Sequence, residues 1–112
     1  MSDPVDLTNL RSMTDGDVDM ELVLFEEFYR TFDEGIAALQ GFMQPEHQEQ
    51  WRKQAHALKG VAVNLGAAAL GAICKQAQEQ HTAEAATKTA ILRDIETHYA
   101  TAREFLIRMA LI

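Results

Sequence analysis

The stretch His56-Ala57-Leu58-Lys59-Gly60-Val61-Ala62-Val63-Asn64-Leu65-Gly66 contains the strongest signals for fold and function in this chain. Its pattern predicts a helix on which a histidine, a lysine and a glycine stand at positions i, i+3 and i+4. Residues at this spacing neighbour one another on a helix surface. Neutral imidazole is a nucleophile, a lysine one turn away can balance negative charge, and a glycine one turn away leaves access open.

The apolar residues of this segment predict which way the histidine faces. With about 100° per residue and Trp51 as origin, His56 falls near 140° and Gly60 near 180°. His56 is therefore expected on the outward side of the helix. A glycine inside a helix costs about 1 kcal/mol relative to alanine, and access to the imidazole would compensate. A surface histidine without a role, beside a glycine needed for close helix contact, explains the geometry equally well. The residues expected on the buried stripe are Trp51, Ala55, Leu58, Ala62 and Leu65.

Helical periodicity extends over most of the chain. Apolar residues spaced by three and four from Leu22 to Met43 predict a long helix, with Asp17 as its N-cap. Pro45 suits the first position of the next helix, and Gly66 its left-handed C-cap. A third helix should end near residue 80, and Thr82 should cap a fourth helix that includes Leu92 to Met109. A short leading helix is expected at about residues 6–13.

These elements predict an all-α fold, an antiparallel four-helix bundle with a short extra N-terminal helix. No segment alternates as a strand would over more than a few residues. Short connections between amphipathic helices place sequence neighbours antiparallel in such a bundle. Residues 1–112 are expected to form one free-standing domain, with residues 1–5 as a flexible N-terminus.

Composition excludes several classes of protein. The net charge is −7, and residues 1–34 contain ten of the seventeen acids, so the basic footprint of a nucleic-acid binder is missing. No apolar run is long enough to span a membrane, and no signal peptide is present, which predicts a cytoplasmic protein. Cys74 is the only cysteine and is expected to be a small buried hydrophobe. The four histidines show no zinc-binding spacing, so no metal site is expected.

The motif resembles that of the histidine-containing phosphotransfer (HPt) domain of multistep phosphorelays. Members of that family have a histidine, a lysine at +3, a glycine at +4, a second glycine near +10 and often a glutamine at +22. The corresponding residues are His56, Lys59, Gly60, Gly66 and Gln78. The family fold is a four-helix bundle with the histidine midway along a central helix, which agrees with the fold predicted from periodicity.

The resemblance implies a role for each site residue. His56 would accept the phosphoryl group, Lys59 would offset its charge, Gly60 would give clearance, and Gln78 would orient the ring or bond the phosphoryl oxygens. Many members have a basic residue directly after the histidine, where this chain has Ala57. The chain would then relay a phosphoryl group between aspartyl-phosphate receiver domains, as a phosphocarrier without kinase or phosphatase activity of its own.

The resemblance also implies the partners. These would be response-regulator receiver domains and a hybrid sensor histidine kinase, with the receiver supplying Mg²⁺ and the carrier acting as a monomer without a cofactor. The docking surface should surround His56 and include Val63. Leu10, Met13 and Met20 either extend this surface or belong to the core.

Two alternatives are of other classes. The chain could be an adaptor that binds a response regulator or kinase without being phosphorylated. An enzyme using His56 is weakly supported, because no acid–base partner stands at a motif spacing.

Overall fold

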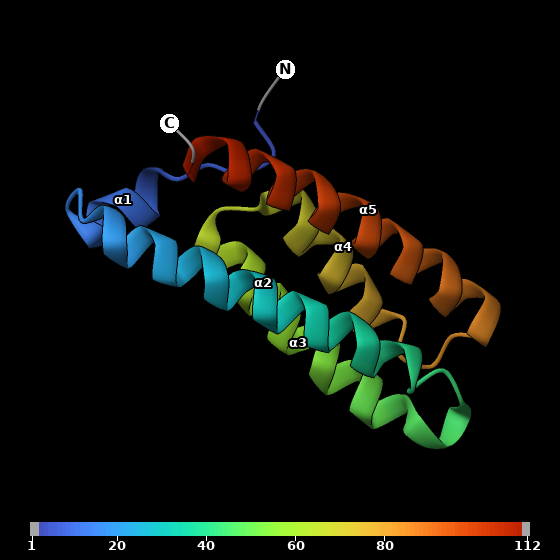
Figure 1. Ribbon diagram of the computed structural model, residues 1–112. Helices are drawn as coiled ribbons and strands as arrows, with labels where there is room; N and C mark the ends of the chain where they lie inside the picture. Colours follow the sequence, from blue (N-terminus) through green and yellow to red (C-terminus); the bar gives the residue numbers. More distant parts are fainter. Residues whose placement is uncertain (1–2, 111–112) are drawn as a thin grey trace.

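The computed structural model describes residues 3–110, and most of this length is helical (Figure 1). No strand occurs between residues 3 and 110. The elements in chain order are α1 (Thr8–Thr14), α2 (Val18–Gln40), the 3-10 turn η1 (Pro45–His47), α3 (Gln48–Leu65), α4 (Ala68–Glu79) and α5 (Ala85–Ala110).

The four long helices form a bundle whose longest dimension is 45 Å. Helix α2 packs on α3, α3 on α4, α4 on α5, and α5 on α2, which closes a ring. Short connections make sequence neighbours antiparallel, and α1 lies at one end of the bundle against α2 and α3 (Figure 1). The predicted fold class, including the short leading helix, is confirmed.

Local signals set the starts of α2 and α3. The Asp17 carboxylate accepts a hydrogen bond of 3.1 Å from the backbone N–H of Met20, which confirms Asp17 as the N-cap of α2. Pro45 stands at the first position of η1, so it begins the helical segment one turn earlier than α3 itself. The fixed φ of proline suits either kind of helix start.

The predicted cap of the last helix is wrong. Thr82 lies in a turn after α4, where the N–H of Ala83 donates to the carbonyl of Gln80. Helix α5 begins only at Ala85, and its first backbone bond runs from Lys88 to the carbonyl of Glu84. The turn after α4 therefore continues past Thr82 and delays the helix start.

Gly66 joins the N-terminal segment to the turn between α3 and α4. Its φ of +99° is the left-handed conformation expected of a C-cap, and a Cβ atom there would lie 1.9 Å from the carbonyl oxygen of Asp6. The N–H of Asp6 donates to the carbonyl of Gly66 at 2.9 Å, and Val5 is buried. The prediction of a flexible segment 1–5 is therefore wrong at Val5, while residues 1 and 2 lie outside the described part.

Trp51 connects three helices beneath the outward face of α3. Its ring is fully buried, and its indole N–H donates to the carbonyl of Ala77 in α4 at 2.8 Å. The Lys88 ammonium of α5 lies 5.1 Å from the centre of the same ring. These contacts fix α3 against α4 close to His56 and Gln78.

Candidate functional site

His56 stands on the middle of α3 and faces outward. All five residues of the predicted stripe are buried, with Trp51 and Leu58 completely covered, whereas His56 and Gly60 are exposed. The orientation predicted from helical geometry is confirmed. The backbone of α3 therefore presents the imidazole on the bundle surface without help from a loop.

Gln78 reaches His56 from the neighbouring helix α4. Its side-chain oxygen Oε1 lies 3.3 Å from Nδ1 of the imidazole, across 22 residues of sequence. An amide oxygen only accepts hydrogen bonds, so in the neutral ring Nδ1 carries the proton and donates it to this bond. The lone pair is then on Nε2, at the end of the ring farthest from the backbone. The arrangement suits a nucleophile that attacks through Nε2.

Gly60 has no packing role. A Cβ atom built at this position would have no heavy atom within 4 Å, apart from the backbone of its own helix. Gly35 differs, because a Cβ atom there would lie 2.6 Å from Cδ2 of Leu58. The alternative explanation of Gly60, a glycine needed for close helix contact, is therefore excluded. The missing side chain leaves open space one turn from His56.

A hollow lies between α3 and α4, and its lining begins at Lys59, one turn from His56 toward the connecting loop. It has a volume of about 260 Å³, and its surface is almost entirely apolar. Lys59, on the same helix as His56, is one of its lining residues. The residues lining this α3–α4 hollow are Lys59, Val63, Gly66, Ala68, Gly71, Ala72 and Lys75.

The sequence motif did not single out Lys75. This residue stands one turn before Gln78 on α4 and lines the same hollow as Lys59. The only available signal was the spacing of three between Lys75 and Gln78 on a predicted helix. That spacing gains meaning only when the contact between Gln78 and His56 is known.

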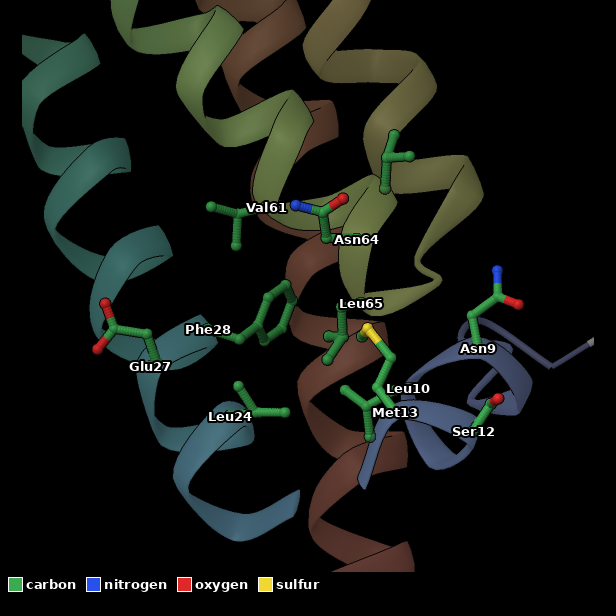
Figure 2. Close-up of a pocket in the computed structure, with 11 residues that line it drawn as sticks. Asn9, Leu10, Ser12, Met13, Leu24, Glu27, Phe28, Val61, Asn64 and Leu65 are labelled. Atoms are coloured by element: carbon green, nitrogen blue, oxygen red, sulfur yellow. The ribbon is translucent and has the colours of Figure 1, made fainter. Parts of the chain in front are cut away.

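A larger, mostly apolar cleft opens farther along α3, between α1, α2 and the C-terminal end of α3. Its volume is about 800 Å³. Figure 2 shows side chains from all three helices around it, with Met13 on α1, Leu24 on α2 and Val61 on α3. Val63 and Asn64 also line the cleft and lie about 10 Å along the helix axis from His56. We call this region the apolar cleft.

The four predicted docking residues fall into two groups. Met13, Val63 and Met20 are exposed to 70%, 56% and 49%, respectively, as a surface contact requires. Leu10 is only 3% exposed and packs in the core, because it is on the inner face of α1. Its assignment to an exposed docking surface is therefore corrected, although its side chain contributes to the floor of the apolar cleft.

Other reactive groups in the described chain lie away from this site or are inert. Burial raises the pKa of the Cys74 thiol to about 12, so the thiolate is not formed at neutral pH. This agrees with the expectation that Cys74 is a small buried hydrophobe. Between residues 3 and 110, no three His, Cys, Asp or Glu side chains are grouped closely enough to hold a metal ion. In the same range, no helix has the length and apolar character needed to cross a membrane.

Comparison with known proteins gives one match. A family model described as the Hpt domain matches residues 23–105, which include α3, α4 and the facing parts of α2 and α5. No curated protein and no solved structure matches the chain.

Proposed function

The chain belongs to the Hpt domain family, whose members are phosphocarrier modules of two-component signalling, and from this premise we propose that His56 relays a phosphoryl group between receiver domains. The observation that carries the proposal is the 3.3 Å contact between Nδ1 of His56 and Oε1 of Gln78. It supports an exposed imidazole held in one orientation with Nε2 free. We infer that the chain works in this relay as a monomer.

In the proposed step, the Nε2 lone pair attacks the phosphorus of an aspartyl phosphate on the receiver. The Nε2–P bond forms as the bond from phosphorus to the aspartyl oxygen breaks, and the carboxylate leaves with the electron pair. Because Nδ1 keeps its proton, the imidazole ring becomes positively charged. The Gln78 carbonyl oxygen accepts a hydrogen bond from this ring and so stabilises the charge that develops on it.

Two further residues of α3 have separate roles in this step. Gly60 leaves room for the phosphoryl group and for the surface of the receiver around it. Lys59, one turn from His56, offsets negative charge on the phosphoryl oxygens. The receiver supplies Mg²⁺, which stabilises the transferring phosphoryl group when bound there.

The apolar cleft is the proposed docking region. Met13 and Val63 line it with exposed apolar surface, and Val63 stands two turns from His56 on α3. Exposed apolar patches of this kind commonly mark protein–protein contacts. We infer that a receiver domain, either of a hybrid sensor kinase or of a response regulator, covers this region while its aspartate faces His56.

The test is transfer from a receiver domain that has been charged with acetyl phosphate in the presence of Mg²⁺. Wild-type chain should gain acid-labile, base-stable phosphate, and His56→Gln should gain none. His98→Gln is the matched control, because His98 is on α5, whose backbone does not pack directly against that of α3. Transfer to His56→Gln at the wild-type rate would refute the site.

The same variants distinguish the adaptor alternative. An adaptor needs the docking surface but not the phosphoryl group. If His56→Gln still binds the partner and controls its output as well as wild type, the relay proposal fails and the adaptor replaces it.

A further inference from the structure

Helices α3 and α4 face each other in a regular series of contacts around the α3–α4 hollow. His56 meets Gln78 at 3.3 Å, and one turn nearer the connecting loop Lys59 and Lys75 both line the hollow. One turn farther, a Cβ atom on Gly71 would lie 3.0 Å from Cγ2 of Val63. Since the helices are antiparallel, each step of one turn along α3 matches a step of one turn back along α4. Lys75 is therefore one turn from the level of His56.

Neither lysine is neutralised by the rest of the described chain. No hydrogen bond or ion pair of the Lys59 or Lys75 ammonium is present between residues 3 and 110. Glu79 stands one turn beyond Lys75 on α4, a spacing that permits an ion pair, yet none forms. The hollow between the two ammonium-bearing side chains is almost entirely apolar.

Two unpaired cations beside one hollow favour an anion at that place. Like charges on facing helices repel each other, and a doubly negative group between them changes this repulsion into attraction. One helical turn is about 5.4 Å, a distance that an extended lysine side chain can span. A phosphoryl group on Nε2 of His56 is within such reach from both sides.

We propose that Lys75 is a second cationic residue of the phosphoryl site, acting with Lys59 from the opposite helix to stabilise phosphorylated His56. The inference rests on the proposed function of His56 and adds a residue from α4. Glycine and alanine on the walls of the hollow leave both ammonium groups free to approach the oxygens. The expected loss without Lys75 is about fivefold, the size of one exposed charge-assisted contact.

The first experiment uses phosphoramidate, a small phosphoryl donor that needs no docking surface. The nitrogen of phosphoramidate gains a proton and leaves as ammonia when the P–N bond breaks, while a new bond forms between phosphorus and Nε2 of His56. Lys75→Gln should accept phosphate about fivefold more slowly than wild type, and Lys75→Arg should keep the wild-type rate. Arg93→Gln removes one positive charge from the exposed side of α5 and should leave the rate unchanged.

The second experiment measures how phosphate partitions at equilibrium between His56 and a receiver domain that exchanges with the wild-type chain. A residue that only helps docking changes the forward and reverse rates together, whereas Lys75 should shift the equilibrium. Lys75→Gln is expected to move it about fivefold toward the receiver. Circular dichroism confirms that each variant is folded.

The outcomes separate the two proposals. If wild-type His56 takes up no phosphate from either donor, the proposed function itself fails. If wild-type His56 is phosphorylated but Lys75→Gln behaves as Arg93→Gln does in both experiments, only the role of Lys75 is overturned. Slower uptake from phosphoramidate with an unchanged equilibrium also overturns it, because that result would assign Lys75 to the transfer step and not to the stability of phosphorylated His56.

Discussion

Replacing Gly60 by alanine should make the protein more stable and less active at the same time. The new Cβ atom would enter space in which no other part of the described chain lies within 4 Å. Nothing in the fold opposes the methyl group, so only the backbone preference changes. Alanine is favoured over glycine in a helix interior by about 1 kcal/mol, because glycine loses more conformational freedom on folding.

The expected gain is therefore as much as about 1 kcal/mol in the free energy of unfolding, or about 4 °C in melting temperature for a domain of this size. Urea denaturation followed by circular dichroism measures it. Gly35→Ala is the matched control, since its Cβ atom would lie 2.6 Å from Cδ2 of Leu58. That substitution should destabilise the bundle by about 1–3 kcal/mol through overpacking.

Phosphoryl transfer should respond in the opposite direction. The added methyl group is one turn from His56, in the space that the phosphoryl group and the receiver surface would occupy. Displacing reacting atoms by about 1 Å can cost up to about 100-fold in rate, so we expect Gly60→Ala to slow transfer at least about tenfold. The assay is the initial rate of phosphate uptake from a charged receiver domain. A more stable variant with the wild-type rate would refute the clearance role of Gly60, and a less stable one would refute the packing argument.

Three further substitutions test other parts of the structure. Gln78→Ala should slow phosphate uptake by His56 about fivefold in the same transfer assay, because the ring loses an orienting hydrogen bond of about 1 kcal/mol; an unchanged rate would contradict this role. Gly66→Ala should lower the free energy of unfolding, measured in urea, by more than about 2 kcal/mol, because φ is +99° and the new Cβ atom would overlap the Asp6 carbonyl. A variant as stable as the wild type would show that the segment around Asp6 moves away at little cost. Lys88→Met should be more stable than wild type by about 1–3 kcal/mol at pH 7, because the buried ammonium has no hydrogen-bond partner in the described chain. Burial lowers the pKa of Lys88 below its usual 10.5, so between the folded-state pKa and 10.5 the unfolded chain binds more protons than the folded chain. The free energy of unfolding of the wild type should therefore rise relative to that of Lys88→Met as the pH approaches 10.5. A difference between the two proteins that does not change with pH would contradict this.

The fold was largely predictable from sequence because its signals are local. The buried stripe of α3, the Asp17 cap and the left-handed Gly66 each depend on residues within one or two helical turns. The helical periodicity that puts Trp51 on the buried stripe of α3 also puts His56 on its outward side. Thr82 does not cap α5, because the chain makes a further turn after residue 80 and α5 begins only at Ala85. The amino-acid composition of this segment does not reveal that turn.

The surroundings of the histidine were only partly predictable. Gln78 entered through family resemblance, and the contact that gives it a role joins residues 22 positions apart. Lys75 was not predicted, and the sequence left open whether Leu10 lies on the surface or in the core, because each depends on how one helix lies on another. Val5 was misjudged for the same reason, since its burial follows from the contact between Asp6 and Gly66.

By itself the sequence determined that the chain forms amphipathic helices, which side of α3 faces the core, and that an exposed histidine has a lysine and a glycine one turn away. These features depend on the helical repeat, which acts over three or four residues. Tertiary structure alone decided that Gln78 contacts Nδ1 of His56, that Lys59 and Lys75 line one hollow, and that α1 completes the apolar cleft. Helix packing sets these relations, because it brings together side chains far apart in sequence at distances that no local pattern encodes.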